Sequence, residues 1–244
     1  MTTNNIEFPE LGDEEEWDVP LDLPAMVGLL DMEVRPMAAR PARELAEREH
    51  YLHRKPAVSF AFGLYCEAAP VGLVTLGCPA SGHLQRGACP AEPSRVIELN
   101  RLWVADAMPK NTASWFVSRA LRQVPPHVIV SYADTTQGHM GYVYRAMSFR
   151  YAGWTDMERR TPRLDYVPLR GGHSREAMRS GYRGTVRRKP KVKYWTTTGD
   201  RRQRRRLAAQ CTWPSLDWKR LPPPTEHRYH RITREDLHGR GQAL

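Results

Sequence analysis

The sequence has few cysteines and no long apolar run. Its four cysteines, at positions 66, 78, 89 and 211, form no Cys-x-x-Cys motif, which indicates reduced thiols in a cytoplasmic protein rather than a disulfide framework. The longest apolar patch, at residues 23–30, is much shorter than the ~20 residues that a membrane-spanning helix needs. The first twenty residues contain no Lys or Arg, unlike the start of a secretory signal peptide. Neither a membrane protein nor a secreted protein is expected.

Charge is distributed unevenly along the 244 residues. Residues 1–144 contain 12 Lys or Arg and 18 Asp or Glu, a net charge of −6, whereas residues 145–244 contain 25 and 9, a net charge of +16. A cationic field of this size attracts phosphate polymers, although a solvated tail or a surface for an acidic protein has the same composition. We expect double-stranded DNA as the partner.

Composition and periodicity divide the chain into three parts. Residues 1–30 are acidic and without periodicity, which predicts a flexible arm; residues 31–165 alternate between strand and helix patterns; residues 166–244 form a basic extension. The middle part predicts strands at 32–36, 57–67, 71–78, 95–104, 127–134 and 149–155, and helices at 38–53, from about 112, and at 138–147. Residues 79–94 are predicted to form a loop. The fold class is α/β (α+β), with a mixed, mostly antiparallel sheet and helices on both faces.

Arginine clusters and aromatic residues alternate in the basic extension. A surface of this kind tracks phosphates and offers stacking platforms, and the alternative is that the aromatics anchor the extension on the core. The predicted DNA-binding residues are Arg187, Arg188, Lys189, Lys191, Lys193, Arg201, Arg202, Arg204, Arg205 and Arg206.

The order of elements resembles the GNAT acyltransferase fold. The strongest local match is Tyr144–Phe149, where GNAT proteins place a Tyr that commonly serves as general acid, although Ser148 replaces the usual Gly. GNAT enzymes cradle the pyrophosphate of coenzyme A with a glycine-containing loop before a helix. Here Thr112 and Ser114 stand at the glycine positions, so ordinary acetyl-CoA use is less easy.

A more specific resemblance is to the Mom DNA-modification proteins of Mu-like bacteriophages. It rests on His50–His53, Glu98–Val104, Met108–Phe116 and Ser131–Gly153, in that order. The resemblance implies a transferase that adds a carbamoylmethyl group to N6 of adenine in phage DNA. That modification protects the DNA from host restriction enzymes, so the site of action would be the bacterial cytoplasm during infection.

Two groups of candidate site residues follow. The catalytic candidates are His50, Tyr51, Asp134 and Tyr144, with Asp134 as the base and Tyr144 as the general acid. The donor-binding candidates are Arg101, Lys110, Thr112 and Ser114. The alternatives are an N-cap role for Asp134, an ion pair between Arg101 and Glu98, and tight helix packing for Ser114.

The target adenine must leave the base stack, which requires a pocket of stacking aromatics. Tyr51, Tyr132 and Trp115 are candidates for that pocket, with core packing as the alternative. His50, with His53 or Asp134, is a candidate site for a divalent metal such as iron. The loose spacing of Cys78, His83 and Cys89 does not favour a zinc site.

Atom counting constrains the group donor. Simple transfer of a glycyl group would give N6–CO–CH2–NH2, the isomer of the carbamoylmethyl product N6–CH2–CO–NH2. Either the donor is attacked at its CH2 carbon, or an aminoacyl intermediate rearranges. The donor candidates are a glycyl donor such as glycyl-tRNA, which would make tRNA a second partner, and an acyl-CoA.

Two other functions fit the same sequence. One is a GNAT N-acetyltransferase acting on a protein or a small amine. The other is a non-catalytic DNA-binding protein that keeps the fold. The intact Asp134 and Tyr144 favour an enzyme.

Overall fold

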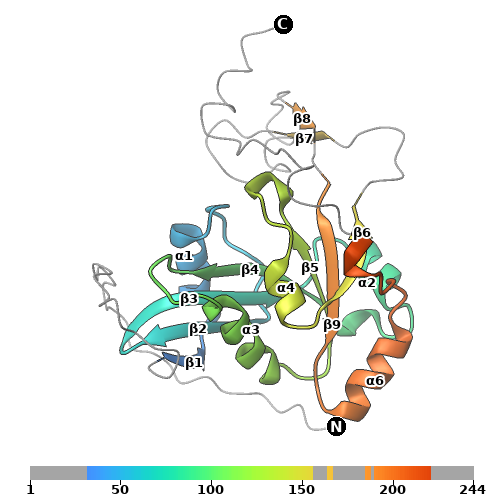
Figure 1. Cartoon of the computed structure of the whole chain (residues 1–244), viewed down its shortest axis with the longest axis horizontal. Helices are drawn as coiled ribbons and strands as arrows, with labels where there is room; N and C mark the ends of the chain where they lie inside the picture. Colours follow the sequence, from blue (N-terminus) through green and yellow to red (C-terminus); the bar gives the residue numbers. More distant parts are fainter. Residues whose placement is uncertain (1–31, 156–163, 167–184, 188–189, 221–244) are drawn as a thin grey trace, which may run out of the picture.

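The computed structural model describes residues 32–155, 164–166, 185–187 and 190–220 (Figure 1). Its centre is a seven-stranded sheet with the strand order β1-β2-β3-β4-β5-β9-β6. Neighbouring strands are antiparallel except for β4 and β5, which run parallel and are joined by α3. The strands are β1 (Met32–Pro36), β2 (Phe60–Cys66), β3 (Ala69–Gly77), β4 (Val96–Val104), β5 (Val128–Ala133), β6 (Arg150–Trp154) and β9 (Val192–Thr197).

Helices cover both faces of this sheet. On one face, Phe116 and Val117 of α3 and Tyr144 of α4 pack with the largest group of buried strand residues. On the other face, α1 packs through Leu45, and α2 and α6 pack around Trp195. The α-helices are α1 (Ala39–Glu49), α2 (Gly82–Ala88), α3 (Thr112–Arg122), α4 (Tyr142–Ala146) and α6 (Arg201–Gln210). The predicted mixed, mostly antiparallel sheet with helices on both faces is confirmed.

Three local predictions were wrong. The predicted loop at 79–94 contains α2, because the Ser81 side chain caps its first turn by accepting a hydrogen bond from the His83 backbone N–H, and the short η2 (Pro93–Arg95). The predicted helix at 138–147 begins only at Tyr142, because Gly141 has a φ of 88° in the left-handed region. The first helix ends at Glu49, so residues 50–53 form a turn and not a fourth helical turn.

Strand β9 comes from the stretch predicted as a basic extension. It lies between β5 and β6, and its Tyr194 and Trp195 are 0% and 2% exposed. These two aromatics anchor the chain in the core. The prediction that they offer a stacking surface for nucleic acid bases is therefore wrong. A division of the chain at residue 165 would therefore cut the sheet.

Several predictions lie outside the described residues. They concern the acidic arm at 1–30, the residues Arg188 and Lys189, and most of the chain between β6 and β9. Within that stretch the structure describes the backbone of β7 (Leu164–Tyr166) and β8 (Thr185–Arg187), which pair antiparallel. Among the described residues, no helix is both long enough and apolar enough to span a membrane.

Candidate active site

The parallel pair of strands separates partway along its length. The ladder between β4 and β5 ends at Leu99 and Ser131, although both strands continue beyond that point. A bulge at this level leaves Asn100 without a partner in β3, and its side chain bonds Thr75 and the Ala57 carbonyl. The carboxyl ends of parallel strands are a common place for functional groups, and here they gather polar side chains.

A carboxylate stands at the centre of this group. Asp134 follows β5, and its Oδ2 atom lies 3.0 Å from Nζ of Lys191 and accepts a 3.3 Å hydrogen bond from the Tyr51 hydroxyl. The Asp134 side chain is only 9% exposed. The nearby ammonium group favours the ionised carboxylate in this buried place. We call Tyr51, Asp134 and Lys191 the carboxylate cluster.

The alternative role of Asp134 as the N-cap of a helix at residue 138 is wrong. Helix α4 begins later and is capped at Gly141. The Asp134 side chain is instead bound to groups from α1's C-terminal turn and from the start of β9, which are 83 and 57 residues away in sequence.

His50 and Arg101 lie beside the carboxylate cluster. Burial, together with the positive charge of Arg101, lowers the pKa of His50 to about 3, so its imidazole is neutral at pH 7. The His50 ring lies 4.3 Å from the Tyr51 ring, centroid to centroid. Burial also lowers the pKa of Arg101, whose Nε atom is buried and has no hydrogen-bond partner among the described residues. An unpaired buried donor is costly, which makes Arg101 a candidate for binding an acceptor group.

Tyr144 lies behind the cluster, under the strand split. Its hydroxyl oxygen is 2.7 Å from Oγ of Ser131, and its ring stacks on Tyr194 with 4.8 Å between centroids. Burial raises the pKa of Tyr144 to about 12, so the phenol is neutral and able to donate a proton. Burial also raises the pKa of Glu98, whose carboxyl group interacts electrostatically with Lys191, Arg101 and Tyr144.

The residues near Asp134 do not make a complete metal site. The His50–His53 pair rested on a shared helical face, and that basis is wrong because α1 ends before His50. His53 is exposed, and its Nδ1 bonds the Glu47 carbonyl. Across the described residues, no three His, Cys, Asp or Glu side chains are grouped to hold a metal. The Lys191 ammonium already pairs with Oδ2 of Asp134, so a divalent cation bound to that oxygen would be repelled by the positive charge of Lys191.

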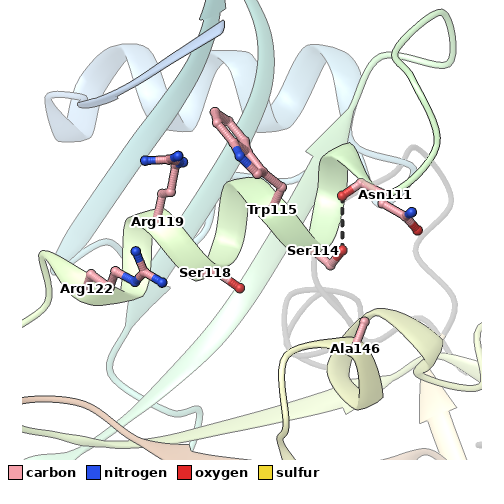
Figure 2. Close-up of a pocket in the computed structure, with 7 residues that line it drawn as sticks. All are labelled: Asn111, Ser114, Trp115, Ser118, Arg119, Arg122 and Ala146. Carbon is pink, nitrogen blue, oxygen red and sulfur yellow. Dashed lines mark hydrogen bonds between the residues drawn. The ribbon is translucent and has the colours of Figure 1, made fainter. Parts of the chain in front are cut away.

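A separate pocket of about 340 Å³ lies between α3 and α4 (Figure 2). It is lined by Asn111, Ser114, Trp115, Ser118, Arg119, Arg122 and Ala146. Figure 2 shows Ser114 and Ser118 on the side of α3 toward Ala146, and the Ser114 hydroxyl donates a 3.0 Å hydrogen bond to the Asn111 carbonyl. This pocket offers hydroxyls and two guanidinium groups to an anionic ligand.

The predicted donor-binding residues divide between these two places. Ser114 lines the α3–α4 pocket. Lys110 is exposed in the turn just before α3 begins. Thr112 is 2% exposed and donates its hydroxyl to the Pro109 carbonyl, so it closes the turn before α3. Arg101 lies with the carboxylate cluster instead.

The predicted DNA-binding residues also divide. Lys191 belongs to the carboxylate cluster, and the Lys193 ammonium lies 5.4 Å from the centre of the Trp213 ring. Arg201, Arg202, Arg204 and Arg205 are exposed on α6, whereas Arg206 forms an ion pair with Glu92. Arg187 lies in β8, where the structure describes the backbone alone.

Sequence reasoning missed two members of the site. Lys191 was assigned to DNA contact, and the available signal was the alternating pattern of residues 191–197, which is typical of a strand. His139 was not singled out, and its ring lies 5.8 Å from the Tyr51 ring in an edge-on arrangement.

Solved structures with a similar backbone course are acetyltransferases. One is a GNAT-family acetyltransferase from Bacillus cereus, at 11% identity and a TM-score of 0.39, covering 69% of this chain and 99% of the other. Another is a phosphinothricin acetyltransferase of the GNAT superfamily from Sinorhizobium meliloti, solved with AcCoA, at 10% identity and a TM-score of 0.41, covering 69% and 89%.

The sequence comparisons are more specific. The model of the Mom protein family matches residues 31–210, and the chain belongs to this family. A curated relative, the methylcarbamoylase Mom of Escherichia phage Mu, is 30% identical over 135 residues, which are 52% of this chain. The chain spans about half the length of that relative, at 55%. The matched range 31–210 includes β9 and α6, in agreement with their place in the fold.

Proposed function

We propose that this protein is a transferase that adds a carbamoylmethyl group to N6 of adenine in DNA. The observation that carries the proposal is the carboxylate cluster at the split of β4 and β5, in a chain of the Mom protein family. The name of the phage Mu relative, methylcarbamoylase, supports the same chemistry.

Adenine N6 needs help to act as a nucleophile, because its lone pair is delocalised into the ring. A carboxylate that accepts a hydrogen bond from N6–H raises the electron density on nitrogen and takes the proton as the new bond forms. Asp134 is the base in this proposal, because it is held by Lys191 and Tyr51 and is nearly buried. With a glycyl donor, N6 attacks the carbonyl carbon, one N6 proton passes to the carboxylate, and the leaving oxygen or sulfur of the donor keeps the electron pair of the bond that breaks. The N6–CO–CH2–NH2 adduct then rearranges to N6–CH2–CO–NH2, which contains the same atoms.

The neighbouring groups serve binding and proton transfer. The Nδ1 atom of neutral His50 accepts a hydrogen bond from the Leu52 backbone N–H, so its Nε2–H can donate to a substrate without adding charge, and neutral Tyr144 can protonate a leaving group. The Nε atom of Arg101 binds an acceptor on the base or the donor.

The donor is a glycyl compound or an acyl-CoA. Its anionic part binds in the α3–α4 pocket, where Arg119 and Arg122 offer hydrogen-bond donors. Growth of cells on isotope-labelled glycine tests the glycyl donor, which carries the label into the modified base. An acetyl group adds only C2H2O, so an acyl-CoA donor must carry an acyl group that also supplies the amide nitrogen.

The partner is double-stranded DNA in the bacterial cytoplasm during phage infection, and tRNA is a partner only if the donor is glycyl-tRNA. The target adenine is extruded from the helix, which costs a few kcal/mol and is offset by phosphate contacts outside the site. Modification at N6 changes the edge that restriction enzymes read in the major groove, so it protects the DNA.

The test is to express the chain with a plasmid and to digest that plasmid to nucleosides for tandem mass spectrometry. The proposal predicts a deoxyadenosine heavier by one C2H3NO unit, with fragments of N6–CH2–CO–NH2. Fragments of the isomer N6–CO–CH2–NH2 would show that the reaction stops after acyl transfer. Unmodified DNA from cells that contain folded protein would contradict the proposal.

A further inference from the structure

A second polar groove lies at the other end of β9, between α6 and the edge strand β6. It has a volume of about 350 Å³, and its polar lining comes from Ser148, Arg150, Thr197, Arg201, Arg204 and Arg205. We call it the α6 groove. The sheet register places Thr197 beside Val128 at the start of β5, whereas the carboxylate cluster lies beyond Ala133 at its end.

The four arginines of the α6 groove are not used to hold the fold together. Arg201, Arg204 and Arg205 are exposed and form no ion pair with an acidic residue in the described part of the chain. By contrast, Arg206 of the same helix pairs with Glu92, outside the groove. Among the residues that the structure describes, these guanidinium groups therefore have no acidic partner.

This arrangement destabilises the helix that carries it. Residues at i, i+3 and i+4 share one helix face, so Arg201, Arg204 and Arg205 repel one another. Arg201 also stands in the first turn, where a positive charge opposes the helix dipole, and α6 has no acidic residue in that turn. The Asp200 side chain caps the helix by accepting a hydrogen bond from the Gln203 N–H. A bound polyanion would reduce the repulsion among these arginines and stabilise the helix.

The opposite wall of the groove holds a guanidinium group in a fixed orientation. Arg150 at the start of β6 lies over the ring of Trp195, with 4.4 Å between its Cζ atom and the ring centre. Trp195 is 2% exposed and bonds the Pro214 carbonyl, so its ring is a rigid base for the arginine. Stacking of this kind leaves the edge of the guanidinium group available to hydrogen-bond a phosphate.

We propose that the α6 groove binds the phosphate backbone of duplex DNA at a distance from the modified base. The choice of DNA as the polyanion rests on the proposed function. About six strand residues separate Lys191 from Thr197, which at ~3.3 Å per residue is roughly 20 Å. A duplex rises 3.4 Å per base pair along each strand, so about six base pairs span that distance. The separation of the two places along β9 is therefore within the length of a short duplex.

The test is the salt dependence of DNA binding, measured by fluorescence anisotropy with a labelled duplex. The groove variant is Arg201→Gln/Arg204→Gln/Arg205→Gln. The matched control is Arg35→Gln/Arg40→Gln/Arg48→Gln, which removes the same charge from arginines that already pair with Glu33, Glu44 and Glu49. Each phosphate contact adds about 0.9 to the slope of log K against log salt. We expect the slope to fall by about 2.7 in the groove variant and to stay unchanged in the control.

The same relation predicts an affinity loss on the order of a hundredfold at 0.15 M salt. The variant Arg201→Lys/Arg204→Lys/Arg205→Lys keeps the charge and should keep most of the slope, which guards against a folding defect in the Gln variant. An unchanged slope in the groove variant would overturn the proposal and leave an acidic protein as the class of partner. Equal losses in groove variant and control would also overturn it, because net charge alone would explain them.

Modification of plasmid DNA, measured in parallel, separates this inference from the proposed function. DNA binding with a groove-dependent slope, but without modified adenine, contradicts the proposed function alone. If adenine is modified but the salt dependence of DNA binding is the same in the parent chain and the groove variant, the proposal for the α6 groove alone is contradicted.

Discussion

The two ends of β9 handle positive charge in opposite ways. At the Lys191 end, the ammonium pairs with a carboxylate that is 9% exposed, and the neighbouring groups have shifted pKa values. At the α6 end, exposed arginines line a groove without acidic partners among the described residues. Buried paired charges fix protonation states, whereas exposed unpaired charges set the electric field that a polyanion meets. Strand β9 thus connects the carboxylate cluster, which is suited to proton transfer, with the α6 groove, which is suited to binding a polyanion.

The largest effect is expected from Asp134→Asn. The amide cannot take a proton from N6, so modification of plasmid adenine should fall by about 10²- to 10⁴-fold. Binding of duplex DNA should be retained, because the arginines of the α6 groove are untouched. Asp106→Asn, an exposed change in a turn, is the matched control and should modify DNA normally. If Asp134→Asn also loses DNA binding, the assignment of chemistry to one end of β9 and DNA binding to the other would be contradicted.

Leu207→Ala tests whether α6 is part of the folded unit. Leu207 is 0% exposed and packs with Trp195 and its neighbours, so its truncation should cost about 2–5 kcal/mol of unfolding free energy. Urea denaturation measures this quantity. Ala209→Ser, an exposed change on the same helix, should stay within about 0.5 kcal/mol of the parent. Equal stability of the two variants would show that α6 does not need its apolar contact.

Lys191→Met removes the positive charge next to Asp134, the proposed base. Without the ammonium 3.0 Å away, the protonated form of Asp134 is less disfavoured, so the acid limb of the pH profile of modification should move to higher pH. Because Lys191 is partly exposed, we expect the low end of such effects, about one pH unit. Lys55→Met, which removes a cation paired with Glu47, should leave the profile in place. A shift to lower pH would contradict the assigned role.

The smallest effect concerns His50 and stability. Its folded-state pKa of about 3 lies below the unfolded value of 6.5, so the unfolded chain binds more protons between these two values. The neutral His50 therefore contributes stability that is fully present above pH 6.5 and is lost as the pH falls toward 3. His50→Gln should flatten the decline of unfolding free energy with acid by at most about 1.4 kcal/mol per pH unit. His83→Gln on α2 is the control, and an unchanged slope in His50→Gln would refute the interpretation.

Strand and helix patterns predicted most of the sheet, because its strands are short runs rich in apolar and β-branched residues; β3 and β5 are buried almost continuously and do not alternate. The exceptions have local causes. The short helix α2 depends on the Ser81 cap rather than on an apolar period, and α4 starts late because of the Gly141 backbone conformation. Strand β9 was hidden by its lysines, since a charge-rich segment resembles a surface tail until its Val192, Tyr194 and Trp195 are seen to be buried.

The site was predicted in part for a similar reason. Asp134 was chosen from its position at the end of a strand, and His50 and Tyr51 from their position at the end of the first helix; the fold brings the three together. No sequence rule pairs Lys191 with a carboxylate 57 residues away, because that contact depends on the place of β9 in the sheet. The division of the arginines of α6 likewise depends on which helix face meets β6 and which meets Glu92.

The most direct test of the account is tandem mass spectrometry of nucleosides from plasmids expressed with the parent chain and with Asp134→Asn, at matched levels of folded protein. The account predicts a deoxyadenosine heavier by C2H3NO, with carbamoylmethyl fragments, in the parent and almost none in the variant. The same modified nucleoside at equal abundance in both samples would contradict the central role of the carboxylate cluster.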